Sequence, residues 1–236
     1  MTKNCLLYLL LICLSSQQLY AQPEPMEMAM KEMKKMTPKF GLKVGYNIAG
    51  LYGSTPNFTP KSSNGFNASV FYSPATNGLG YRTELIFSRQ GFSFDEGGKL
   101  QSVSQDYVYM PHLTTFTIAS RVQLQAGGQV GYMLNTKKEG AGAAAPPAGG
   151  GSAEEEKIMD YLNRIDYGAT LGFEIYPFKG FIVGGRYNIS MGNMYKQVKS
   201  LSMPPPSSVL GSFLPVNPAD FKGKNAVIQF SVGYRF

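Results

Sequence analysis

Residues 225–236, the end of the chain, read N-A-V-I-Q-F-S-V-G-Y-R-F and separate in steps of two into two unlike sets. One set is apolar or aromatic throughout: Phe236, Tyr234, Val232, Phe230, Ile228 and Ala226. The other set has a single apolar member: Arg235, Gly233, Ser231, Gln229, Val227 and Asn225. A period of two indicates one β-strand with two different faces. An apolar face that ends in aromatic residues is typical of a strand facing lipid, with its polar face turned toward a lumen.

The same alternation recurs earlier in the chain. It predicts seven further strands, at residues 40–51, 64–72, 79–90, 106–118, 121–135, 165–176 and 181–191. The segment 106–118 is the least regular: its pattern slips near Thr114 and Thr115, which suggests a bulge, and Pro111 removes one ladder donor.

The connections alternate in length along the chain. The first, third, fifth and seventh are long, at residues 52–63, 91–105, 136–164 and 192–224, and the others are short. Up-and-down membrane barrels have this parity, with short turns on one side and long loops on the other. The sequence therefore predicts an all-β fold: an eight-stranded antiparallel up-and-down transmembrane β-barrel.

The first residues indicate export. Lys3 precedes an apolar stretch that is too short for a permanent membrane helix, and Ala21 suits cleavage. We expect a signal peptide at 1–21, a Met-rich periplasmic linker at 22–39 and an outer-membrane barrel at 40–236, in a Gram-negative cell envelope. Both cysteines, Cys5 and Cys13, lie within the predicted signal peptide.

On this register, charged side chains point into the lumen. The predicted structural network comprises Lys43, Arg82, Glu84, Arg121, Asp166, Glu174, Arg186 and Arg235, with Asp106 also inward. An eight-stranded barrel is only wide enough for side chains to fill, so these charges should pair and plug the lumen. A conducting lumen is the alternative.

Catalysis, metal binding and nucleic-acid binding find little support. The net charge of +7 is scattered along the chain, without the clustering of a nucleic-acid interface. The chain has one histidine, His112, which we expect to point into the lumen network. Motifs for metalloproteases, serine hydrolases and phosphate-binding loops are absent from the sequence. We therefore expect no enzyme activity and no cofactor; an enzyme that uses His112 is the alternative.

Three segments carry a resemblance to a known family. The opening strand F-G-L-K-V-G-Y-N-I-A-G-L (40–51), the strand D-Y-V-Y-M-P-H-L (106–113) and the terminal F-S-V-G-Y-R-F (230–236) resemble the PorT-like outer-membrane β-barrel family of Bacteroidetes. The resemblance implies an outer-membrane location and insertion by the barrel assembly machinery. That machinery would read the C-terminal aromatic residues Phe230, Tyr234 and Phe236. One member of the family is tied to type IX protein secretion.

These observations predict a small, non-enzymatic outer-membrane barrel with a plugged polar lumen and long extracellular loops. Its role would be structural, adhesive or secretion-associated. Its partners would be outer-membrane lipid, lipopolysaccharide and a protein that docks on the loops. The alternative is a soluble periplasmic lipocalin-like barrel that binds an apolar ligand inside and carries a charged exterior.

Overall fold

The computed structural model describes residues 38–54, 59–74, 78–96, 98–140, 159, 161–196 and 222–236. The predicted signal peptide and the linker lie outside these residues, except that Pro38 and Lys39 already belong to the first strand. No helix within the described part of the chain is both long and apolar enough to cross a membrane.

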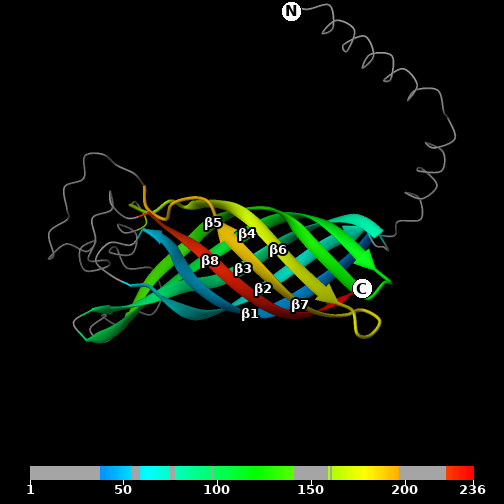
Figure 1. Cartoon of the computed structure of the whole chain (residues 1–236), viewed down its shortest axis with the longest axis horizontal. Helices are drawn as coiled ribbons and strands as arrows, with labels where there is room; N and C mark the ends of the chain where they lie inside the picture. The colour runs from blue at the N-terminus through cyan, green and yellow to red at the C-terminus, as the bar shows by residue number, and fades with distance from the viewer. Residues whose placement is uncertain are drawn as a thin grey trace, which may run out of the picture. The chain divides into compact units, whose positions relative to one another are not determined.

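Eight strands form the described fold. They are β1 (Pro38–Ser54), β2 (Lys61–Pro74), β3 (Gly78–Glu96), β4 (Lys99–Ile118), β5 (Val122–Gly140), β6 (Ile165–Ile175), β7 (Phe181–Ser190) and β8 (Lys222–Arg235). Each strand pairs antiparallel with its neighbour in sequence, and β1 pairs with β8 to close the ring (Figure 1). A closed ring leaves no unpaired edge, so every strand has two partners. The predicted fold is confirmed.

The ring has two different ends. The connections β2–β3, β4–β5 and β6–β7, the start of β1 and the end of β8 lie at one end, which we call the short-turn end. The opposite end is called the loop end. At the short-turn end, Ala119 and Ser120 both adopt positive φ, 50° and 59°, and Arg121 N donates to Ile118 O at 3.0 Å. This geometry makes a tight turn, and the connection between Ile118 and Val122 is three residues long.

The prediction for the third connection is wrong. Residues 91–105 were expected to form a long loop, but β3 and β4 continue in register as far as the pair Glu96↔Lys99. The segment alternates apolar and polar residues, with Phe92, Phe94 and Val103 on one face, and all three are buried. The β3–β4 hairpin extends past the other strands at the loop end (Figure 1), and the packing of its apolar face stabilises this extension.

The predicted bulge near Thr114 is also misplaced. Burial alternates without a break along β4 from Leu100 to Ile118. The register with β5 instead shifts between Asp106 and Tyr107, where the partner residues change from Asn135 to Met133. The extra residue, Leu134, belongs to β5, and it keeps both Met133 and Thr136 buried on the inner face.

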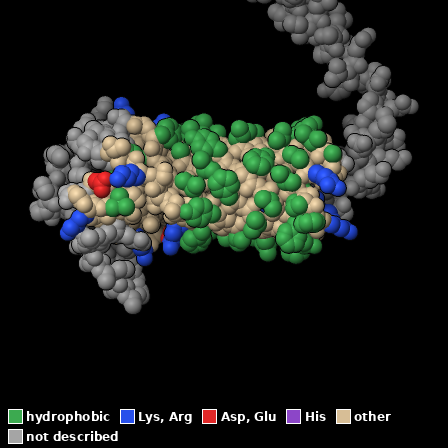
Figure 2. Space-filling model, turned by 60° about the horizontal axis from the view of Figure 1, so that its bottom comes forward, with side chains coloured by type: hydrophobic (Ala, Val, Ile, Leu, Met, Phe, Trp, Pro, Cys, Tyr) green, Lys and Arg blue, Asp and Glu red, His purple; other side chains and the backbone are tan. Residues whose placement is uncertain are grey.

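The outer surface of the ring is apolar. Phe40, Leu42 and Val44 on β1 are 62%, 52% and 59% exposed, and the other seven strands carry equivalent rows. Figure 2 shows this band of hydrophobic side chains, with Lys and Arg gathered toward the two ends. The inner residues of the same strands are polar and buried, among them Asn47, Arg82 and Glu174. The lipocalin-like alternative requires the reverse arrangement and is therefore wrong.

Candidate functional site

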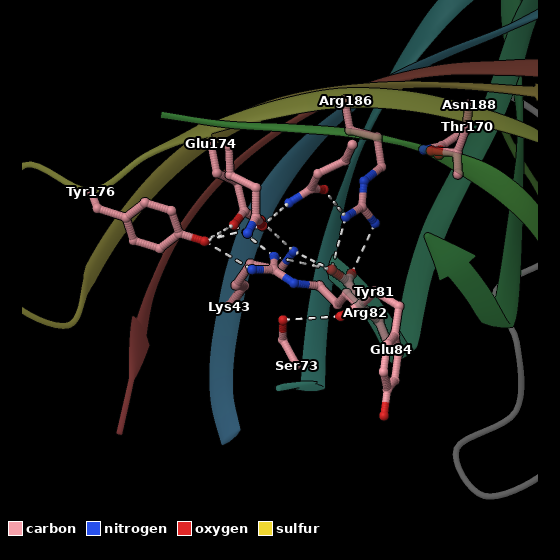
Figure 3. A network of polar contacts seen from close by, with 12 residues as sticks. Lys43, Ser73, Tyr81, Arg82, Glu84, Thr170, Glu174, Tyr176, Arg186 and Asn188 are labelled. Atoms are coloured by element: carbon pink, nitrogen blue, oxygen red, sulfur yellow. Dashed lines mark hydrogen bonds and ion pairs between the residues drawn. The ribbon is translucent and has the colours of Figure 1, made fainter. Parts of the chain in front are cut away.

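A cluster of five charged side chains fills the lumen near the short-turn end. Lys43 lies on β1, Arg82 and Glu84 on β3, Glu174 on β6 and Arg186 on β7 (Figure 3). Alternation along each strand turns all five inward, and each is at least 91% buried. Residues far apart in sequence thus meet because the sheet closes on itself. We call these five residues the lumen plug.

Ion pairs connect all members of the lumen plug. Glu84 accepts two hydrogen bonds from Arg186, at 2.8 and 2.9 Å, and one from Lys43 Nζ at 2.7 Å. Glu174 accepts from Arg82 Nη1 at 2.6 Å and from Lys43 Nζ at 2.9 Å. Lys43 therefore joins the two carboxylates. Three cations share two carboxylates, and each buried charge has an opposite partner, as burial in a low dielectric requires.

Neutral groups add further contacts to the plug. Tyr176 accepts a hydrogen bond from Arg82 Nη2 at 2.9 Å and donates one to Glu174 at 3.0 Å. Gln125 accepts from Arg186 Nη2 at 2.9 Å. The Phe71 ring lies 4.3 Å from the Arg82 guanidinium and 5.4 Å from Lys43 Nζ, which adds a cation–π contact.

Two glycines give the plug its space. Gly184 pairs with Glu174 across β6 and β7, and Gly233 pairs with Lys43 across β1 and β8. A Cβ on Gly184 would lie 2.8 Å from Glu174 Cγ, and one on Gly233 would lie 2.6 Å from Lys43 Cγ. The long side chains thus cross positions where the neighbouring strand carries no side chain.

The space that remains beside the plug is small. One cavity of about 10 Å³ is lined by Lys43, Glu84 and Arg186, and another of about 10 Å³ lies beside Gln90 and Tyr109. Each has room for about one water molecule. Such spaces suit trapped water between polar groups and are too small for a solute.

The remaining predicted lumen charges do not join the plug. Asp166 is buried nearer the loop end, where its carboxylate accepts hydrogen bonds from Tyr109 at 2.7 Å and from Ser190 at 2.5 Å. Arg235 is half-buried at the short-turn end, with its guanidinium 4.5 Å from the Tyr176 ring.

Three sequence assignments are wrong. Arg121 follows the Ala119–Ser120 turn and is exposed. Asp106 faces outward on β4 and pairs with Arg89 through two hydrogen bonds of 2.7 and 2.8 Å. His112, expected in the lumen, is exposed on the outer surface, where its Nδ1 lies 2.9 Å from Thr83 Oγ1. In strand β4 it is Tyr107, Tyr109 and Leu113 that point inward.

Sequence reasoning missed an apolar cluster at the loop end. It includes Phe92, Phe94, Val103, Met133, Met159, Leu162, Met194 and Tyr195, all buried. Burial raises the pKa of the Tyr195 hydroxyl, which therefore stays protonated. The alternation of Phe92 and Phe94 with Ser93 and Asp95 was the available signal.

The site offers little for catalysis or metal binding. Within the described ranges, His, Cys, Asp and Glu form no group of three that could hold a metal ion. His112 bonds to the Thr83 hydroxyl rather than to a carboxylate, and it faces away from the lumen. The buried, mutually paired charges of the lumen plug fill the ring instead.

The residues predicted as an assembly signal lie on the outer surface. Phe230, Tyr234 and Phe236 are 53%, 42% and 65% exposed near the chain end. Tyr234 packs edge-on against Phe181 and Phe236, with ring centroids 5.8 and 5.2 Å apart. Phe181, Tyr234 and Phe236 thus form part of an aromatic girdle at the short-turn end.

Known structures resemble this ring. Ail, the attachment invasion locus protein of Yersinia pestis, is 15% identical, with 85% of this chain and 100% of that chain covered, at a TM-score of 0.42. Neisserial surface protein A is 12% identical, with 84% of this chain and 97% of that chain covered, at a TM-score of 0.45. The outer membrane protein OprG from Pseudomonas aeruginosa is 14% identical, with 85% of this chain and 97% of that chain covered, at a TM-score of 0.43.

A family model identifies the family of this chain, although no curated protein matches it. Residues 20–196 of the 236 match the profile of a family described as outer membrane protein beta-barrel domain. The match covers most of the chain and agrees with the closed ring and its apolar exterior. This protein therefore belongs to the outer membrane protein beta-barrel domain family and resides in the outer membrane.

Proposed function

We propose that this barrel is closed to solutes and works at its extracellular end, where it docks a partner as an adhesive or structural element. The observation that carries the proposal is the lumen plug, in which three cations and two carboxylates pair with one another across the ring. Short turns face the periplasm and long loops the exterior in such barrels, so the loop end is extracellular.

The extracellular end supports docking because it is built as a rigid projection. β3, β4 and β5 pair beyond the outer apolar band, as far as Glu96↔Lys99 and Gln101↔Gly140. The inner face of this extension is held by the buried rings of Phe92 and Phe94. Its outer face carries polar contacts, including the exposed pair Lys61–Asp95 at 2.7 Å. We call this three-stranded extension the platform.

Docking can be tested at the tip of the platform. Leu100 is 55% exposed there, beside the exposed Lys99. We expect the double variant Lys99→Ser/Leu100→Ser to reduce attachment of expressing cells to surfaces or to one another. Phe178→Ser, on the periplasmic β6–β7 turn, is the matched control because Phe178 is 73% exposed at the other end. Unchanged attachment of the tip variant, at equal surface display, would contradict the docking role.

Closure can be tested separately in planar bilayers. The intact protein should give no stable single-channel current at moderate voltage, since side chains fill an eight-stranded lumen. A steady conductance from the wild-type protein would contradict the proposal and would favour the conducting alternative.

We also propose that the protein is not an enzyme and uses no cofactor, because the buried charges are engaged with one another.

A secretion-associated role is a second candidate. Support comes from the resemblance of residues 40–51, 106–113 and 230–236 to PorT-like barrels of Bacteroidetes. If this role holds, deletion of the gene should block export of type IX cargo, with complementation by the intact gene. Normal cargo export in the deletion strain would count against the role.

Assembly and lipid contacts complete the proposal. We infer that the barrel assembly machinery recognises Phe230, Tyr234 and Phe236, which share one face of β8. Replacing Phe236 by serine should then lower the yield of heat-modifiable barrel in membranes, while Phe178→Ser should not.

We also infer that Lys222 and Lys224, at the extracellular start of β8, contact lipopolysaccharide phosphate.

A further inference from the structure

The lipid-facing surface carries a polar patch in the middle of its apolar band. The outward side chains of β4 run from Ile118 at the periplasmic end to Asp106, which pairs with Arg89 at the extracellular end. His112 is midway between them and is exposed. Its position is therefore close to the centre of the bilayer, where a polar side chain facing lipid is costly.

Strand register gathers small and polar residues around His112. His112 pairs with Thr83 on β3 and with Gly128 on β5, and Gly128 pairs with Ala169 on β6. One step along β4, the exposed Thr114 pairs with Ala126 of β5. We call this set the midplane patch; it comprises Thr83, His112, Thr114, Ala126, Gly128 and Ala169. Larger side chains flank it, including Tyr81, Leu85, Met110 and Val130, each about half exposed.

Hydrogen bonding in the patch is incomplete within the described part of the chain. The Nδ1 of His112 is engaged with Thr83 Oγ1 at 2.9 Å, and its second ring nitrogen has no partner there. The hydroxyl of Thr114 likewise has no partner among the described residues. Hydrocarbon chains can satisfy neither group, and polar groups within a bilayer are normally satisfied by protein.

We propose that the midplane patch is the contact surface between two copies of this barrel in the membrane. Every copy is inserted with the same orientation, so a two-fold axis along the membrane normal brings residues of equal depth together. A patch at the bilayer centre then meets itself. Imidazole and hydroxyl groups each donate and accept, so the patch is complementary to its own copy.

The small residues make the contact close. Association inside a bilayer gains little from the hydrophobic effect and depends on packing and on polar contacts between segments. Gly128 is exposed, and a Cβ added to it would meet only Gly168 O, at 3.8 Å, among the residues that the structure describes. A facing backbone can approach there, which brings His112 and Thr114 of one copy within reach of the other.

Disulfide trapping tests the geometry. Cys5 and Cys13 are the chain's two cysteines, and they are replaced by serine. In the full chain refolded into phosphatidylcholine vesicles, Thr114→Cys should form cross-linked dimers under mild oxidation. Val232→Cys on β8 is the control, because Val232 is also exposed, at 53%, but lies four strands away around the ring. Equal yields at the two positions, or none at Thr114, would overturn the proposal.

Energy transfer between labelled copies tests the role of His112. We expect transfer to rise with the protein-to-lipid ratio and His112→Leu to weaken association about tenfold. His112→Asn, which keeps donor and acceptor groups, should retain most of it. The Leu variant should remain heat-modifiable, since leucine suits a lipid-facing position. Wild-type protein that is monomeric at every ratio would mean that lipid covers the patch. Equal association of the Leu and wild-type proteins would overturn the role of His112 in the contact.

Discussion

Glu84 neutralises more positive charge than any other residue of the lumen plug, because Lys43, Arg186 and Arg82 all lie within 3.5 Å of its carboxylate. Glu84→Gln keeps the shape but leaves three buried cations facing one carboxylate. We expect the free energy of unfolding to fall by about 3–5 kcal/mol, the usual cost of removing one partner of a buried pair. Urea denaturation in phospholipid vesicles, followed by heat-modifiable migration, measures the change.

The matched control is Asp95→Asn, which breaks the exposed pair with Lys61. Both side chains of that pair are more than half exposed, so its loss should cost at most about 1 kcal/mol. Equal effects of the two substitutions would show that burial adds nothing to the Glu84 contacts.

Gly131 is fixed by an aromatic neighbour. It pairs with Tyr109 across β4 and β5, and a Cβ on Gly131 would lie 2.3 Å from the Tyr109 ring. Tyr109 is itself held by its bonds to Gln90 and Asp166, so the ring cannot move freely. We expect Gly131→Ala to destabilise the barrel by about 1–3 kcal/mol in the same unfolding assay.

Gly128→Ala on the same strand is the comparison for Gly131→Ala. Its added methyl group would have only an ordinary contact at 3.8 Å. The stability of the Gly128 variant should therefore stay close to that of the wild type. A loss as large as that of Gly131→Ala would mean that glycine itself, rather than the ring of Tyr109, is required on β5.

At the residue scale, the sequence predicted inward charges from alternation alone. That rule placed Lys43, Arg82, Glu84, Glu174 and Arg186 on lumen faces, but it could not assign partners, which depend on closure of the ring. It erred for Arg121 because the strand starts one residue later, at Val122. It erred for His112 because the two faces of β4 were exchanged: Tyr107 and Tyr109 point into the lumen, so His112 points outward. Exchanging the faces of a strand reverses the direction of every side chain on it.

Among the elements, the β3–β4 hairpin shows how far a strand can extend past its expected end. Phe94 is fully buried in the apolar cluster and contacts Phe92 at a centroid distance of 6.2 Å. Phe94→Ala should open a cavity costing about 3–5 kcal/mol, which acts on the platform alone. Amide hydrogen exchange across residues 92–103 should accelerate, whereas amides of β6 and β7 should be unaffected.

Leu100→Ala serves as the control for the platform, since its side chain is exposed at the hairpin tip. It should leave exchange within the hairpin almost unchanged. If Phe94→Ala instead accelerated exchange throughout the barrel, the platform and the ring would form one cooperative unit.

Element boundaries were harder to predict than element number. The number of strands follows from eight alternating segments, each long enough for a tilted span. The platform was read as loop because Gly91, Gly97 and Gly98 interrupt the pattern. In the structure, a Cβ on Gly91 would lie 1.9 Å from Val103 O, so this glycine allows β3 and β4 to approach closely and continue.

For the whole molecule, the distribution of polarity is the reverse of that in a soluble protein. Apolar side chains cover the exterior while Lys43, Glu84 and Arg186 lie inside. The terminal strand already pointed to this inversion, since an apolar row that ends in aromatic residues is typical of a strand that faces lipid. The apolar cluster at the loop end departs from it, because the inward side chains of Phe92, Phe94 and Met133 belong there to one buried apolar cluster with Leu162, Met194 and Tyr195.

Lys43 determines whether the closed state depends on pairing or only on bulk. Lys43→Ala removes the residue that hydrogen-bonds to both Glu84 and Glu174. It leaves two cations and two carboxylates, with Arg186 on Glu84 and Arg82 on Glu174. The barrel should still fold, because every remaining buried charge keeps a partner. The vacated volume adjoins the cavity lined by Glu84 and Arg186, so water and small ions should gain a path. Planar bilayers should then record currents that the wild type lacks, whereas Lys61→Ala, at an exposed site, should stay silent. If Lys43→Ala folded and remained closed, the other lumen side chains alone would suffice to seal the ring.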